Sequence, residues 1–225
     1  MDRKPLDTEI DHHTAKFIVG FIALSLAIFT DLLTPGVSIR SISLSYHLTD
    51  NARNVFVGSL CVISAFLWSY NGYSLFQAVL SKFAAIAVAS VAFSPCDCFT
   101  GRFDDGVTRE ATMTGVVHTI SAISMFIILA IFCWLFYLRA KEKNSKEAKA
   151  RGLIYRVCAS VMVGAMAVQL LDILGVDFSG ITQRLTYYVE ATGLFAFGVA
   201  WLTASRMLPF ITNEDERIKI ELAGK

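Results

Sequence analysis

The sequence predicts an all-α integral membrane protein: a bundle of six transmembrane helices that forms a single membrane domain over residues 1–225. Composition is the first observation behind this prediction. Of the residues, 55% are hydrophobic and only 17% are charged, whereas soluble domains are about 45–50% apolar and about 25% charged. The second observation is a series of apolar runs, each close to the ~20 residues that a helix needs to cross a bilayer.

Helix-stopping residues mark the ends of the apolar runs. Thr34-Pro35-Gly36 closes the first run, Asn71-Gly72 marks a turn after the second, and Pro95 ends the third. The serine-rich segment 36–53 is too polar to span, so we expect it to lie at the interface or to re-enter the membrane in part. The six expected spans cover about residues 15–33, 52–70, 74–94, 111–138, 155–174 and 183–207.

The fourth run, Ala111 to Leu138, contains no Asp, Glu, Lys or Arg. As a helix it would be roughly 42 Å long, which exceeds the ~30 Å hydrocarbon core of a bilayer. Its one side chain that ordinarily titrates near neutral pH is His118. Because a titratable group at membrane depth is costly, His118 is a candidate functional residue.

The charges of the connecting segments predict the orientation of the bundle. Segment 139–156 carries seven Lys or Arg and two Glu, so the positive-inside rule places it in the cytoplasm. With six spans, the tails 1–14 and 211–225 are then cytoplasmic too, and the acidic segment after the third span is outside. We expect a multi-pass protein of the cell membrane, either the plasma membrane or a bacterial inner membrane.

With this orientation, polar residues gather in the outer half of the membrane. His118 and Glu190 each lie seven residues inside the outer end of their helix, at a depth of roughly 10 Å. They could form an ion pair, share a proton or hold a metal. The alternative is that such residues only bond neighbouring helices or are solvated at the interface. The other candidate ligand-binding residues are Thr114, Ser121, Gln169, Asp172, Asp31 and Arg53.

A zinc site is the main catalytic hypothesis. His47, His118 and Glu190 are the candidate ligands, and zinc bound by three protein groups could activate water for hydrolysis of a lipid amide or ester. Cys96 and Cys98 allow a reduced pair, a local disulfide, a soft metal site or no role. The other three cysteines lie in apolar runs and are interpreted as packing residues.

Three stretches carry a resemblance to a known family. Residues Arg53–Gly58 read R-x-V-F-V-G, residues His118–Ala122 read H-x-x-S-A, and Glu190 is followed by F-G-x-x-W-L, which ends at Leu202. These stretches resemble a family of small multi-spanning bacterial membrane proteins of unknown function. The resemblance implies a membrane fold over the second to the sixth span, and it implies no activity.

A shorter motif, Ser43-x-x-x-His47, is similar to one in the alkaline ceramidase and adiponectin-receptor superfamily, whose members include zinc hydrolases. The chain departs from that pattern in two ways. Six spans are expected instead of seven, and no His-x-x-x-His pair occurs near the C-terminus. The likeness therefore extends to Ser43 and His47 alone.

These observations leave three classes of function. We expect an outward-facing polar pocket in the membrane that binds a lipid-like or small polar ligand, with His118 and Glu190 as a protonatable pair. The alternatives are a zinc-dependent lipid hydrolase and a non-catalytic accessory or assembly subunit, so enzymatic activity stays open. Expected partners are membrane lipids, a small amphiphile or another membrane subunit. The net charge of +1, without a basic face, argues against nucleic acid.

Overall fold

The computed structural model describes residues 12–97, 112–143, 145–208 and 212, and these residues form helices and connecting segments without strands. Six of the helices are long and apolar enough to cross a membrane, as the sequence predicts. The seventh, α2, is a single turn. In chain order the helices are α1 (His12–Leu32), α2 (Ser45–Leu48), α3 (Asp50–Ser69), α4 (Leu75–Phe93), α5 (Met113–Glu142), α6 (Lys146–Ile173) and α7 (Leu185–Ala204).

Serine and threonine side chains fix where four of the long helices begin. Each hydroxyl oxygen accepts a hydrogen bond from a backbone N–H in the first turn, which satisfies a donor that the helix itself leaves unpaired. These N-cap residues are Thr49, Ser74, Thr112 and Ser145.

The prediction was wrong for the basic connection after the fourth span. Instead of a long loop over 139–156, α5 continues to Glu142 and α6 begins at Lys146. The charged residues there are good helix formers, and the Ser145 hydroxyl caps the new helix at 3.1 Å from Ala148 N. The basic segment is therefore the tip of a helical hairpin.

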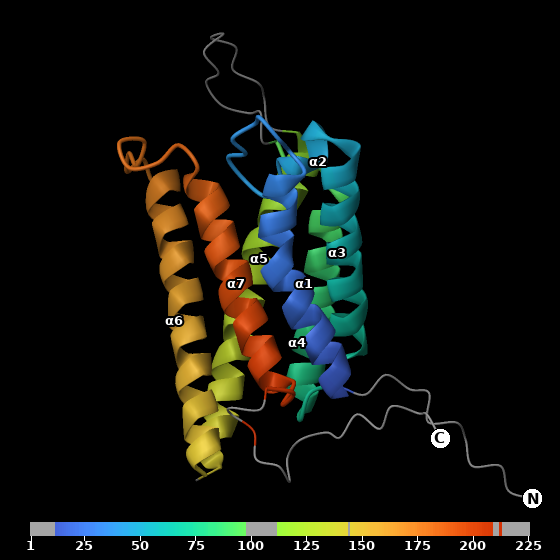
Figure 1. The fold of residues 1–225 in the computed structure, drawn as a ribbon, viewed down its shortest axis with the longest axis vertical. Helices are drawn as coiled ribbons and strands as arrows, with labels where there is room; N and C mark the ends of the chain where they lie inside the picture. The colour runs from blue at the N-terminus through green and yellow to red at the C-terminus, as the bar shows by residue number, and fades with distance from the viewer. Residues whose placement is uncertain (1–11, 98–111, 144, 209–211, 213–225) are drawn as a thin grey trace, which may run out of the picture.

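The six long helices run side by side along one axis (Figure 1), and their contacts close a ring. Going around it, the order is α1, α3, α4, α5, α6 and α7, and α7 packs against α1 again. Helix α6 lies at the periphery and packs against α5 and α7. Below, the end of the bundle where α1 begins and α7 ends is the termini end, and the opposite end is the cap end.

Helices α1 and α7 approach each other most closely at two glycines. A Cβ atom added to Gly20 would lie 2.8 Å from the carbonyl oxygen of Gly198, and one added to Gly198 would lie 2.8 Å from the carbonyl oxygen of Gly20. Only glycine allows two helix backbones to pack at this distance. Nearer the termini end, the buried rings of Phe132, Phe197 and Trp201 form the aromatic centre of the core.

Candidate functional site

The segment between α1 and α3 folds back over the cap end of the bundle. We call residues 37–48 the cap segment. Ile39 and Ile42 are buried, and two groups at the start of α7 hold the backbone beside them: Arg184 Nε donates to the Ile39 carbonyl at 2.8 Å, and Tyr187 N donates to the Arg40 carbonyl at 2.8 Å. The cap segment is therefore packed as part of the protein.

Two residues on either side of this segment are joined to each other. The Thr49 hydroxyl, which caps α3, donates to the carbonyl of Leu33 at the end of α1 with a distance of 3.1 Å. Gly36, in the turn after α1, has a φ of +79°, a left-handed conformation that glycine adopts without strain.

Ser43 of the cap segment connects the two titratable residues that the sequence singled out. Its hydroxyl oxygen lies 3.1 Å from His118 Nε2 on α5 and 3.4 Å from Glu190 Oε1 on α7. The other carboxylate oxygen of Glu190 accepts from the backbone N–H of Ile42 at 2.5 Å. Ser43 and His118 are both buried. We call these three residues the Ser43–His118–Glu190 cluster.

Hydrogen-bond chemistry allows two proton arrangements in this cluster. His118 Nδ1 lies 2.7 Å from the carbonyl of Ser94, which can only accept, so Nδ1 carries a proton. In the neutral arrangement, protonated Glu190 donates to Ser43, and Ser43 donates to His118 Nε2. In the charged arrangement, His118 Nε2 donates to Ser43, and Ser43 donates to Glu190. His118 is then an imidazolium and Glu190 is ionised. Every polar group is satisfied in both, and transfer of one proton along the chain interconverts them.

Two further titratable groups face His118. His47 Nε2 lies 3.0 Å from the carbonyl of Cys96, and Asp97 accepts from the backbone N–H of Thr112 at 2.6 Å and from its hydroxyl at 2.7 Å. A Cβ atom at Gly115 would overlap the Asp97 carboxylate. Glycine at this position of α5 is therefore what lets Asp97 reach the start of the helix.

The remaining candidate residues are not part of the cluster. Asp31 pairs with Arg184 at 2.5 Å, and Arg53 pairs with exposed Asp50 at 2.6 Å. Gln169 Nε2 donates to Asp172 on the same helix at 3.4 Å. Thr114 is exposed and its hydroxyl lies 2.9 Å from that of Thr112, while Ser121 is half-buried on α5. Within the described part of the chain, the hydrogen bonds of His118 and Glu190 go to the cap segment and to the end of α4.

The candidate zinc ligands His47, His118 and Glu190 do not converge on one point. The hydrogen bond of His47 is to Cys96, whereas the bond between His118 and Glu190 runs through Ser43. Among residues 12–97, 112–143, 145–208 and 212, no group of three His, Cys, Asp or Glu is placed to hold a metal. Cys96 is disulfide-bonded, Cys98 lies outside the described residues, and the other three cysteines are free.

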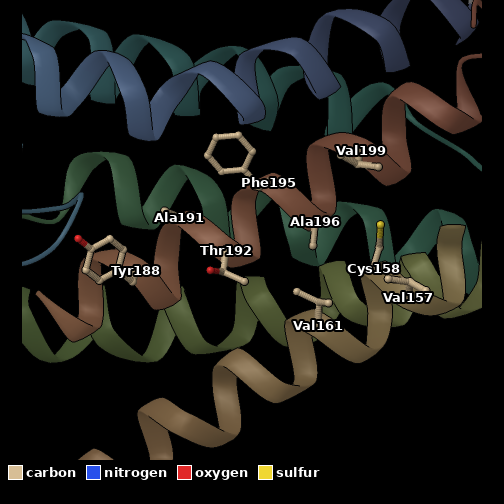
Figure 2. A pocket seen from close by; sticks show the side chains of 9 residues that line it. All are labelled: Val157, Cys158, Val161, Tyr188, Ala191, Thr192, Phe195, Ala196 and Val199. Atoms are coloured by element: carbon tan, nitrogen blue, oxygen red, sulfur yellow. The ribbon is translucent and has the colours of Figure 1, made fainter. Parts of the chain in front are cut away.

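An apolar groove lies between α6 and α7 (Figure 2). Tyr188 stands at its cap end, Val199 on α7 at the other end, and Val157 and Val161 of α6 form the opposite wall. His118, Glu190 and Asp172 do not line it. The groove is therefore separate from the Ser43–His118–Glu190 cluster.

The sequence analysis did not identify Arg184 as a site residue, and it identified Ser43 only through the Ser-x-x-x-His motif. Arg184 links three elements, because it pairs with Asp31 of α1, donates to Ile39 of the cap segment and stacks on the ring of Tyr187 with its Cζ 4.1 Å from the centroid. A positively charged residue directly before an apolar run is the sequence signal that could have identified Arg184.

Comparison with known proteins gives one result that bears on identity. No curated protein and no solved structure matched the chain. One family model, described as "Protein of unknown function (DUF998)", matches residues 17–200. This confirms the resemblance to a family of unknown function that the three stretches from Arg53 to Leu202 predict. The chain, whose described residues include six helices able to cross a membrane, belongs to the DUF998 family.

Proposed function

We propose that the cap end of this membrane protein binds a lipid-like or small polar ligand and that the shared protons of His118 and Glu190 control access to it. The observation that carries the proposal is the position of Ser43, hydrogen-bonded between two titratable groups inside membrane-spanning helices. Ionisable groups at membrane depth are costly and are a reason to suspect function.

The cap segment is the element that protonation would move. With one proton shared between His118 and Glu190, the cluster has no net charge and all its bonds are made. Removing that proton leaves two acceptors competing for one Ser43 hydroxyl and a net negative charge. Adding a proton gives a net positive charge and leaves the Ser43 hydroxyl without an acceptor. Because both states are unfavourable in a buried site, both should release the cap segment.

The apolar groove favours a lipid-like ligand over a small polar one. It lies on a membrane-spanning part of the bundle, so an acyl chain is the occupant that fits its chemistry. Its cap end is marked by Tyr188, whose ring is 5.8 Å from the Arg184 guanidinium. A lipid with its chain in the groove would place an anionic or polar headgroup near this cation.

We further propose that the termini end is cytoplasmic and the cap end faces outward in the plasma or inner membrane. Basic residues support this orientation, because Arg139, Lys141 and Lys146 lie at the hairpin tip and Lys16 lies near the start of α1. The disulfide-bonded Cys96 also supports this orientation. Cys96 lies at the cap end, and disulfides persist in oxidising compartments such as the outside of the cell.

The controlling role of the cluster predicts a bell-shaped pH profile for the protection of the cap segment against hydrogen exchange. Hydrogen exchange of the cap segment, measured across pH in lipid nanodiscs and corrected for intrinsic exchange, should be slowest at intermediate pH and faster on both sides. Glu190→Gln should remove the alkaline limb because glutamine cannot ionise. His118→Gln should remove the acid limb. His13→Gln, which changes a histidine at the termini end of the bundle, is the matched control and should keep both limbs.

A profile that is flat in the wild type would contradict control by protonation and would favour the accessory-subunit alternative, in which the cluster only fixes helix packing. Metal analysis of the same protein tests the hydrolase alternative separately. Stoichiometric zinc that is lost in His118→Ala would support that alternative against the one proposed.

The lipid-like ligand is testable with a photoreactive phosphatidylcholine in the nanodisc. Crosslinks should concentrate on peptides of α6 and α7 that line the groove. Thr192→Trp, which places a large ring in the groove, should reduce them several-fold. Val163→Trp, on an exposed face of α6 outside the groove, should leave them unchanged. Equal labelling of both variants would argue against binding in the groove.

A further inference from the structure

The face of α6 that lines the apolar groove continues beyond the groove toward the cap end. Cys158 and Val161 line the groove, and Gln169 and Asp172 each lie 11 residues further along the same helix. This separation is about three helical turns plus about 20°, so the second pair shares the helix face of the first. The groove face of α6 therefore ends in two polar side chains.

These two side chains are level with the cap end of the groove. On α7 the groove extends from Val199 to Tyr188, a separation of 11 residues and about 16 Å. Val157 of α6 lies with Val199 at the other end of the groove (Figure 2), and the two helices run in opposite directions. The same length measured from Val157 leads to Val168, the neighbour of Gln169. Gln169 and Tyr188 are therefore at a similar depth.

Helices α6 and α7 are loosely packed over this part of their length. The buried residues of α6 all lie within 148–162, and residues 163–173 include none that is buried. On α7 the buried residues begin only at Gly193. A headgroup can therefore lie between the cap-end halves of the two helices without displacing side chains of the packed core.

Gln169 and Asp172 offer hydrogen-bond acceptors that the protein does not use in full. Gln169 Nε2 donates to the Asp172 carboxylate at 3.4 Å, whereas Gln169 Oε1 is shielded from solvent and has no hydrogen-bond partner among the described residues. Asp172 pairs with no cation in the described part of the chain, and the basic residue nearest in sequence, Arg184, is paired with Asp31. A shielded acceptor without a donor is costly, which points to a donor that a ligand supplies.

A primary ammonium group matches these acceptors. It combines several N–H donors with a positive charge, so it can donate to Gln169 Oε1 and pair with Asp172 at the same time. Gln169 is half-buried and its side chain is flexible, so the amide can turn toward a donor that enters from the groove. Building on the lipid-like ligand of the proposed function, we propose that the lipid in the groove has a headgroup that ends in a primary ammonium, which Gln169 and Asp172 bind.

The start of α7 suits the rest of such a headgroup. In phosphatidylethanolamine a phosphate lies between the acyl chains and the ammonium. The Arg184 guanidinium, 5.8 Å from the ring of Tyr188 at the cap end of the groove, is the cation that this phosphate would approach. A headgroup that carries both charges therefore matches a cation on α7 and an acceptor pair on α6.

Comparison of three lipids is the test. The full chain is placed in phosphatidylcholine nanodiscs with a trace of photoreactive phosphatidylethanolamine, phosphatidylcholine or phosphatidylglycerol, each with the same photoreactive acyl chain. Phosphatidylcholine has the positive charge but no N–H donor, and phosphatidylglycerol has hydroxyl donors but no positive charge. Phosphatidylethanolamine should label the groove peptides about fivefold or more above either of the others, as expected for a charge-assisted hydrogen bond that is partly exposed to water.

Variants assign this preference to the two acceptors. Gln169→Leu and Asp172→Asn should each reduce labelling by phosphatidylethanolamine to the level of phosphatidylcholine, whose own labelling should not change. Gln169→Leu removes a shielded acceptor without a donor, so it should not lower the unfolding temperature. Asp177→Asn is the matched control, because it removes an exposed carboxylate from the connection between α6 and α7, and it should keep the preference.

Two results would overturn the ammonium headgroup while leaving a lipid in the groove. One is equal labelling of the groove peptides by phosphatidylethanolamine and either of the other lipids. The other is a preference for phosphatidylethanolamine that persists in both Gln169→Leu and Asp172→Asn, because the selectivity would then arise elsewhere. Absence of groove labelling by all three lipids would contradict the lipid-like ligand itself, so the two failures are distinguishable.

Discussion

Gly20→Ala is expected to lower the free energy of unfolding by about 1–3 kcal/mol, the usual cost of overpacking. The added methyl group would lie 2.8 Å from the Gly198 carbonyl oxygen and 2.8 Å from the backbone nitrogen of Leu202. Both atoms belong to the backbone of α7, so no side-chain rotation can relieve the clash. The two helices must separate along their contact, and denaturant titration in detergent micelles measures the loss.

Gly164→Ala is the matched control, because it is the same substitution inside another membrane-spanning helix. A Cβ atom there meets nothing within 4 Å. The change should therefore be neutral or stabilising by up to ~1 kcal/mol, as alanine is the better helix former. If both variants lost the same stability, the close approach of α1 and α7 would not be what limits position 20.

Arg184→Gln is expected to release the cap segment and to cost about 1–3 kcal/mol of stability, the range for losing hydrogen bonds to a charged group. It removes the ion pair with Asp31 and the bond to the Ile39 carbonyl. The side chains of Arg184 and Asp31 are 22% and 40% exposed, so water compensates part of the loss. Hydrogen exchange in residues 37–48 should become faster, while the amides of α4 stay protected.

The control for this prediction is Arg53→Gln, which removes an ion pair of similar length on the surface. Arg53 and Asp50 are 45% and 83% exposed, so their pair should contribute less than about 1 kcal/mol. Exchange in the cap segment should not change. Similar exchange in both variants would mean that Arg184 does not hold the segment.

Hydropathy and helix-stopping residues were sufficient to predict six spans near their observed positions, because membrane length and backbone hydrogen bonding leave few other solutions. They failed at the connection 139–156, where the charged residues continue both helices instead of forming a loop. Charge indicates that a segment leaves the membrane, but it does not indicate that the helix ends.

For the candidate site, depth along a helix identified His118 and Glu190, but it could not show what lies between them. Ser43 comes from a polar segment whose path depends on tertiary contacts, such as the bond from Ile42 N to Glu190. Asp31 shows the same limit in reverse. Its position near a helix end was predicted, whereas its partner, Arg184, is set by helix rotation and packing.

The bond between Thr49 and Leu33 has a mechanical consequence. By fastening residues on either side of the cap segment to each other, it makes residues 34–48, which include that segment, resemble an Ω loop with a closed neck. Such a loop can swing about its neck while the helices that it joins stay where they are. Residues 34–48 would then work as a hinged flap over His118 and Glu190, and the movement of this flap would not have to be transmitted to the opposite membrane face.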